Sequence, residues 1–221
     1  MLKGFAYFII MIDPVDFDKC VSIMRTFFKV KGCIEVYPQH LSILVCEDPQ
    51  NITTFQYENQ LWPLPQSGKI WLEYEMLKDR APGYFCVSTC YRNSGILPMF
   101  EFELKGGLDK MNEFEHQLLE FMGFKTNDYT EVCLTDIPNH MWTIKQKSVI
   151  IHGIETITLA EHSTDPIDMR NRFNMDISYN IFGNRVIDEV ELFLNHTFIE
   201  RSSGGIDITQ MIRGMKLSNL M

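Results

Sequence analysis

The 221-residue sequence lacks a long apolar run and has no excess of basic charge. The apolar stretch near its start, GFAYFIIMI at residues 4–12, is too short to cross a membrane and is not followed by a signal-peptide cleavage site. It predicts a strand or a short buried segment, and no membrane association. Acidic residues outnumber basic ones by 29 to 20, which argues against a broad nucleic-acid surface, although a local basic groove stays compatible with it.

Cysteine pairs at metal-binding spacing are also missing. None of the six cysteines forms a C-x-x-C pair, and most of them stand in apolar or mixed runs. This usage is typical of reduced core cysteines in a cytoplasmic protein, and it disfavours a disulfide framework or a zinc site. The sequence contains no internal repeat, low-complexity tract or long linker, so we expect one substantial core or two small ones.

Local signals predict helices towards both ends and strands in the middle. Asp13 and Pro14 resemble a helix N-cap and first turn, apolar residues recur at helical spacing to about Val30, and Gly32 ends the pattern. The other predicted helices lie at 108–122, at 165–173, at about 179–195 and after Gly204-Gly205. Predicted extended segments are 33–38, 83–92, 99–104 and 148–163, while 69–77 could be a helix or a strand. This order indicates an α+β domain built on an antiparallel sheet.

The stretch SSGGIDITQMIRGMK, residues 202–216, combines two glycines with a helical pattern. A Gly-rich turn that leads into a helix can hold a phosphate, because free backbone N–H groups and the helix dipole point at the anion. Asp207, however, stands where this helix should begin. Aspartate is a favoured N-cap, so its own carboxylate would occupy the anion position.

Several segments together resemble the signature motifs of class II aminoacyl-tRNA synthetases. KGCIEVYP (31–38), after its helix, resembles motif 1; STCYRNSGILPMFEFEL (88–104) resembles motif 2; and residues 202–216 resemble motif 3. LPQSGKIWLE (64–73) and IIHGIETITLAEHSTDP (150–166) are similar to the segments that lie between these motifs in the aspartyl/asparaginyl/lysyl subgroup and its asparagine-synthetase-type relatives. The resemblance covers about residues 14–217.

This resemblance implies a six-stranded antiparallel sheet flanked by helices, in one synthetase-like domain over residues 1–221 without an anticodon-binding domain. ATP and an amino acid would lie on the sheet and form an aminoacyl-adenylate. Motif 1 implies a homodimer that uses residues 14–38. Without an anticodon module and with an acidic net charge, the chain is not expected to bind tRNA tightly.

Adenylate formation brings two anions together, so it needs fixed cations and magnesium. The resemblance assigns catalytic roles to Arg92 and Glu155, with Glu155 as a metal ligand. It assigns nucleotide binding to Arg92, Glu101, Gly204, Gly205 and Arg213, and substrate binding to Gln66, Glu103 and His162. The alternative for Glu101 and Glu103 is the solvated face of an alternating strand.

Several positions depart from the synthetase pattern. Ser94 and Ser148 stand where the family has acids, Asp207 replaces a glycine, and Gln210 replaces the motif 3 arginine. His162 replaces an arginine that reads the substrate side chain, and a mostly neutral imidazole has no planar fork for bidentate pairing. Arg213, three residues after Gln210, is the nearest cation that could substitute.

Two main hypotheses follow. The first is a synthetase-like protein with a degenerate site, which binds a small amino-acid-like molecule or a partner without ordinary adenylation and needs no cofactor. The alternative is an ATP- and Mg²⁺-dependent amino-acid ligase, of asparagine-synthetase or aminoacyl-adenylate type, with a rebuilt site. Two further classes are disfavoured: acyl transfer through a cysteine or His162, because no motif places a Cys/His pair, and a tRNA ligase acting alone.

Overall fold

The computed structural model describes residues 12–38, 53–92, 95–134, 143–165, 167 and 199–221. Several predicted features lie outside these residues. They are the helix predicted at 179–195, almost all of the helix predicted at 165–173 and of the apolar start, Cys46 and Ser94. The helices are α1 (Pro14–Val30), α2 (Lys69–Leu77), α3 (Leu108–Met122) and α6 (Ile208–Leu217). The strands are β1 (Ile34–Glu35), β2 (Thr54–Tyr57), β3 (Gln60–Pro63), β4 (Gly83–Arg92), β5 (Gly95–Lys105), β6 (Tyr129–Leu134), β7 (Thr143–Ile151), β8 (Ile154–His162) and β9 (Arg201–Asp207).

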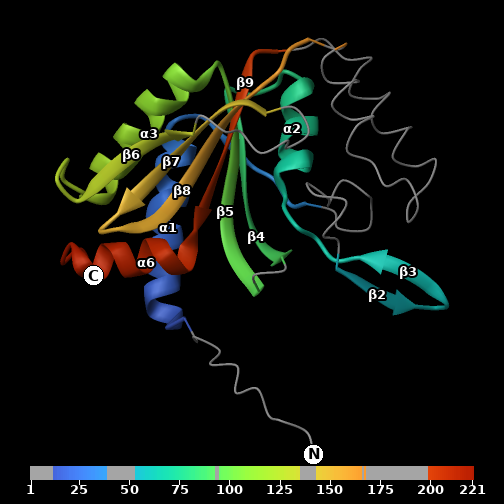
Figure 1. The fold of residues 1–221 in the computed structure, drawn as a ribbon, viewed down its shortest axis with the longest axis horizontal. Helices are drawn as coiled ribbons and strands as arrows, with labels where there is room; N and C mark the ends of the chain where they lie inside the picture. Colours follow the sequence, from blue (N-terminus) through green and yellow to red (C-terminus); the bar gives the residue numbers. More distant parts are fainter. Residues whose placement is uncertain (1–11, 39–52, 93–94, 135–142, 166, 168–198) are drawn as a thin grey trace, which may run out of the picture.

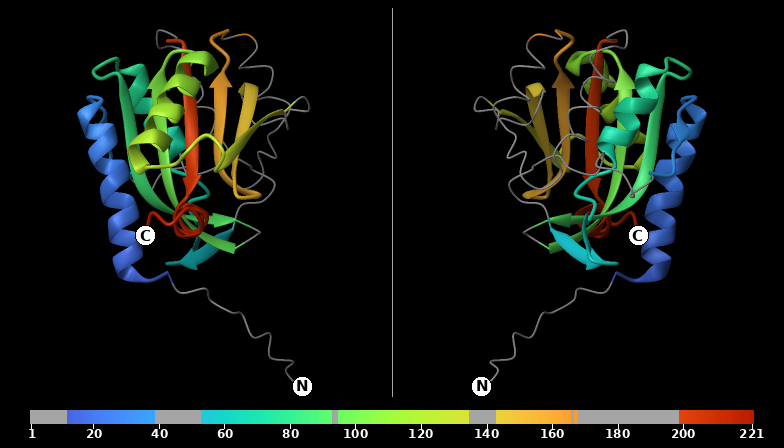
Figure 2. Two further views of the ribbon diagram at one scale, coloured as in Figure 1. Left: turned by 90° about the vertical axis from the view of Figure 1, so that its left-hand side faces the viewer. Right: turned by 90° about the vertical axis from the view of Figure 1, so that its right-hand side faces the viewer.

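One seven-stranded sheet carries the architecture, in the order β1-β4-β5-β9-β8-β7-β6. The six strands from β4 to β6 in this order pair antiparallel, as the sequence predicted, and the short β1 adds a parallel edge. Helices α1, α3 and α6 cover one face of the sheet, and α2 lies on the other (Figures 1 and 2). Strands β2 and β3 form a separate hairpin that extends from the body (Figure 1).

The face under α1, α3 and α6 is the hydrophobic core. Phe28 of α1 lies at its centre, with its ring centroid about 5 Å from those of four other phenylalanines. These are Phe85, Phe100, Phe102 and Phe114. Alternation along β5 puts Phe100, Phe102 and Leu104 on this face and leaves the intervening acids for the other.

The predicted helix boundaries at α1 and α3 are confirmed. The Asp13 side chain accepts a hydrogen bond from the Val15 backbone N–H at 2.8 Å, and Gly123 ends α3 with a left-handed φ of 96°. Residues 69–77, left open by the sequence, are helical, and they bury Leu72 and Met76 at i, i+4 spacing. In all of the described helices, no segment is long and apolar enough to span a membrane.

Two local predictions need correction. Residues 148–163 are not one extended segment: β7 and β8 form a hairpin that turns at His152 and Gly153, both with positive φ, as type I′ turns require. Gly204 and Gly205 do not form a turn either, because both lie inside strand β9. Gly204 is needed for packing, since a Cβ there would lie only 2.1 Å from the Phe102 ring.

The core-cysteine prediction is confirmed for the described cysteines. Cys20, Cys33, Cys86 and Cys90 are buried and Cys133 is exposed, and none of these five is in a disulfide. Burial raises the pKa of Cys20 and of Cys33 to about 12, so both stay protonated thiols at neutral pH.

Phe28→Ala should lower the free energy of unfolding by about 3–5 kcal/mol, because it leaves a cavity among four aromatic rings. Glu113→Ala on α3 is the control: this side chain is exposed, and the change should stay within about 0.5 kcal/mol. Urea unfolding followed by circular dichroism measures both. Equal effects of the two substitutions would contradict the assignment of this core.

Candidate functional site

The face of the sheet opposite the core carries polar side chains, and we call it the polar face. Its residues are aligned by the strand register in two rows. One row runs Cys86, Glu101, Gly205, Thr158 and Ser148 across β4, β5, β9, β8 and β7. The next runs Tyr84, Glu103, Ser203, Ala160 and Gln146 across the same strands. Four of the residues that the sequence marked as site candidates therefore share one surface: Glu101, Glu103, Gly205 and Ser148.

Glu101 fastens the start of α2 to this face. Its carboxylate is fully buried and accepts hydrogen bonds from Ser67 Oγ at 2.6 Å, the Gly68 backbone N–H at 2.6 Å and Ser88 Oγ at 2.7 Å. The Cys90 thiol donates a fourth at 3.7 Å. Glu103 is also fully buried. The alternative of a solvated face for these two acids is therefore wrong, because α2 covers the strand on which they lie.

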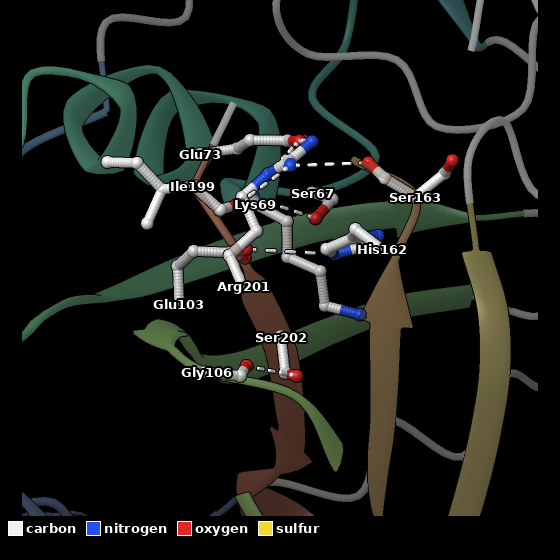
Figure 3. Close-up of polar contacts among 10 residues, drawn as sticks. All are labelled: Ser67, Lys69, Glu73, Glu103, Gly106, His162, Ser163, Ile199, Arg201 and Ser202. Atoms are coloured by element: carbon white, nitrogen blue, oxygen red, sulfur yellow. Dashed lines mark hydrogen bonds and ion pairs between the residues drawn. The ribbon is translucent and has the colours of Figure 1, made fainter. Parts of the chain in front are cut away.

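A buried ion pair joins α2 to β9 (Figure 3). Arg201 Nε donates to Glu73 Oε1 at 2.6 Å, Nη2 contacts the same oxygen, and both side chains are almost completely buried. Arg201 Nη1 donates to the carbonyl oxygens of Ser163 and Ile199, each at 3.3 Å. The sequence marked neither partner, because no motif assigns them and they lie 128 residues apart.

His162 lies in the same region, at the end of β8 (Figure 3). Its Nε2 is 3.8 Å from Glu103 Oε1, and the residue is only 8% exposed. Burial, together with the positive charges of Arg201 and Lys69, lowers the pKa of His162 well below its ordinary value of 6.5. The imidazole is therefore neutral at pH 7. The Lys69 ammonium lies over Gly205, where a Cβ would be 3.5 Å from Nζ.

Arg92 and Gln66, assigned to the substrate, lie together at the end of β4. Arg92 Nε donates to the Gln66 backbone carbonyl at 3.3 Å, and the arginine is half-buried. This contact brings the segment before α2 next to the motif 2 strand. By alternation along β4, Arg92 lies on the same face of the sheet as Cys86 and Cys90.

The predicted metal position contains one carboxylate and two hydroxyl groups. Ser148 Oγ donates to Glu155 Oε1 at 2.7 Å, and Thr158 Oγ1 reaches the same oxygen at 3.4 Å. Magnesium prefers carboxylates, phosphates and water, and a serine adds no charge, so this donor set fits Mg²⁺ poorly. Among the described residues, one group of three side chains that could bind a metal lies close together: Glu115, His116 and Glu131. Lys147 already forms ion pairs with both of these glutamates.

The β9–α6 junction is capped by its own side chain, as the sequence predicted. Asp207 Oδ1 accepts a hydrogen bond from the Gln210 backbone N–H at 3.1 Å. Gln210 Oε1 is buried and has no hydrogen-bond partner, whereas Arg213 is exposed. Of the two predicted glycines, Gly205 lies on the polar face and Gly204 faces the core.

Three solved structures with a similar fold are aminoacyl-tRNA synthetases. Asparaginyl-tRNA synthetase from Pyrococcus horikoshii, complexed with asparaginyl-adenylate, matches with a TM-score of 0.70 and 12% identity, over 93% of this chain and 65% of its own. A putative aspartyl-tRNA synthetase from Leishmania major matches with a TM-score of 0.72 and 12% identity, and the match covers 93% of this chain and 62% of the synthetase. Asparaginyl-tRNA synthetase from Entamoeba histolytica, also in complex with asparaginyl-adenylate, matches with a TM-score of 0.66 and 9% identity. This match covers 91% of this chain and 63% of the synthetase.

The chain has the fold of a class II aminoacyl-tRNA synthetase catalytic core. It spans less than two thirds of the length of each of these three synthetases. No known protein family profile matches the sequence, and no curated protein matches it. The similarity to these synthetases therefore rests on the fold.

This synthetase-like core brings the predicted site residues together in pairs. Arg92 lies beside Gln66, Glu103 beside His162, Ser148 beside Glu155, and Asp207 beside Gln210. Sequence reasoning missed Lys69, Glu73 and Arg201. Lys69 and Glu73 stand in the segment LPQSGKIWLE at 64–73, and Arg201 directly precedes the two serines of motif 3. The sequence signal that could have identified them is a charged residue among apolar or small ones.

Glu73→Gln should lower the free energy of unfolding by about 3–5 kcal/mol, because it leaves the buried Arg201 guanidinium without its counter-charge. Glu75→Gln is the matched control on the same helix. Its partners Lys78 and Arg80 are partly or largely exposed, so a loss below about 1 kcal/mol is expected. Chemical denaturation measures the free energy of unfolding of both variants. If Glu73→Gln leaves it unchanged, this ion pair does not hold α2 on the sheet.

Proposed function

We propose that this chain is a synthetase-like protein that binds a small amino-acid-like ligand on its polar face without ordinary adenylation. The observation that carries the proposal is the Asp207 cap on α6. The carboxylate accepts a hydrogen bond from an N-terminal amide of α6, and it places a negative charge where a nucleotide phosphate would approach. The amino-acid side of the site retains more of the synthetase pattern.

Arg92 and Gln66 support the amino-acid side. A guanidinium can pair with a carboxylate through two parallel hydrogen bonds, and Arg92 is half-buried beside Gln66, where water competes less. Glu103 provides a buried carboxylate on the same face, suited to an ammonium group. An α-amino acid carries both complementary charges, so it is the ligand class that these groups fit.

The nucleotide side lacks its usual charges. Gln210 supplies no cation, and a single carboxylate, Glu155, stands at the metal position with Ser148 and Thr158 bonded to it. Losing one transition-state charge commonly costs about 10²–10³ in rate, and such losses do not simply add. Their combination favours a protein that does not activate its ligand with ATP.

A second function, an ATP-dependent amino-acid ligase, is favoured by Arg213. Its side chain is exposed on α6, one turn beyond Gln210, so it could reach a nucleotide from that side. In this ligase Arg92 and Arg213 would contact the phosphates, and the amino acid would lie against Gln66 and Glu103. Glu101 fits a nucleotide role poorly, because internal donors already occupy its carboxylate.

Asp207→Gly combined with Gln210→Arg should raise the affinity for ATP–Mg²⁺, because one negative charge is removed from the helix N-terminus and one positive charge is added. The wild type should bind it weakly or not at all. Asp207→Gly alone should lower stability by a few tenths of a kcal/mol, roughly the cost of an Asp-to-Gly cap change. Calorimetric titration measures the affinities, and micromolar binding by the wild type would support the ligase instead.

A homodimer through residues 14–38 should form at micromolar concentration. This segment exposes Val15, Val30, Ile34 and Tyr37, which is more apolar surface than one helix and its strand need for the core. Sedimentation velocity should show the dimer, and Val30→Glu should weaken it by about tenfold or more. Ile96→Glu, at an exposed position in β5, is the control, and a monomeric wild type would refute this interface.

A further inference from the structure

A second polar cluster lies between α3 and the β6–β7 edge of the sheet. Lys147 of β7 is almost completely buried, and its ammonium is 2.9 Å from Glu115 Oε2 of α3 and 3.1 Å from Glu131 Oε1 of β6. His116 Nε2 contacts Glu131 Oε1 and lies 3.8 Å from Glu115 Oε2. Glu131 pairs with the buried core residue Val149, so the cluster is on the core side of the sheet, separate from the polar face.

One carboxylate oxygen of this cluster has no partner. Glu115 is fully buried and Lys147 donates to its Oε2, but its Oε1 accepts no hydrogen bond within the described part of the chain. Native proteins seldom leave a buried polar atom unsatisfied, because such an atom has lost its hydrogen bonds to water. Glu131 shares the same ammonium, so the cluster has two carboxylates and one fixed cation. An additional cation would complete it.

The donor atoms of the cluster favour one kind of cation. Glu115, His116 and Glu131 each offer one ligand atom, and these three atoms lie within 4.8 Å of one another. An imidazole nitrogen with two carboxylate oxygens suits zinc and related transition metals, whereas magnesium and calcium prefer oxygen ligands alone. The His116 side chain is half-exposed, so an ion can arrive from solvent and keep a water molecule as its fourth ligand.

Lys147 is compatible with an ion in this cluster. Each glutamate has two oxygens, so one oxygen can bind the metal while the other keeps the ammonium, and for Glu115 the available oxygen is Oε1. Hydrogen bonds of this kind orient the ligands of many metal sites. The ammonium also repels a nearby metal ion, so the affinity should be moderate.

We propose that Glu115, His116 and Glu131 form a binding site for zinc or a similar divalent transition metal. The ion would join helix α3 to β6, the strand at the end of the sheet. Because the metal would bind the folded chain, where these three side chains meet, it should also stabilise the fold. The site does not depend on the proposed function, since it shares no residue with the polar face.

Calorimetric titration of zinc chloride into the chelator-treated full chain tests the site. One equivalent should bind with a dissociation constant of about 1–10 µM, and magnesium chloride should give no binding under the same conditions. His116→Ala and Glu131→Gln should each weaken zinc binding about tenfold or more, because each removes a ligand. Lys147→Met should strengthen it about tenfold, because the repelling ammonium is removed while both carboxylates remain.

Two variants control for zinc bound at other exposed side chains. His152→Ala removes a histidine at the β7–β8 turn, and Cys133→Ser removes the exposed thiol of β6; both should bind zinc like the wild type. Circular dichroism melts show that each variant is folded, and zinc should raise the melting temperature of the wild type but not of His116→Ala. No zinc binding by the folded wild type, or unchanged binding by folded His116→Ala, would overturn the proposal.

Discussion

Strand β9 has no room for a side chain at Gly204, and the packing of the core face of the sheet depends on this. It runs between β5 and β8, with the Phe102 ring against Gly204 on one face and the Lys69 ammonium over Gly205 on the other. A Cβ at Gly204 would overlap the Phe102 ring, so the core under α1 closes only because this residue is glycine. On the polar face, Gly205 leaves the space that the Lys69 ammonium fills.

The polar face is built from buried charges that satisfy one another. Glu101 accepts two hydrogen bonds from the start of α2 and two from β4, and the Glu73–Arg201 pair joins the middle of the same helix to β9. Buried charges of this kind need fixed partners, so they position α2 rigidly over the sheet.

Local signals predicted the parts of the fold that local physics decides. The Asp13 cap, the apolar spacing to Val30 and the left-handed Gly123 act within a few residues, and α1 and α3 follow from them. The alternating acids of β5 left two alternatives open, because a solvated strand face and one covered by a distant helix have the same pattern. The motif resemblance marked Glu101, Glu103, Gly205 and Ser148, which the strand register places on one face of the sheet, and their roles in a site stay predictions.

Long-range pairing decided what could not be predicted. The Glu73–Arg201 pair joins segments 128 residues apart. The glycines of motif 3 looked like a turn, since nothing local reveals that the Phe102 ring packs against Gly204. The Asp207 cap, by contrast, was predictable, because an aspartate at the start of an apolar helical pattern is a strong local signal.

The central claim is that the polar face keeps an amino-acid site while its nucleotide side is closed by Asp207. ATP–pyrophosphate exchange tests this most directly, because it reports reversible adenylate formation without any acceptor for the activated amino acid. With ATP, Mg²⁺ and either asparagine, aspartate or lysine, the wild-type protein should give no exchange above a protein-free control. Exchange that depends on one of these amino acids and is lost in Arg92→Ala would contradict the account.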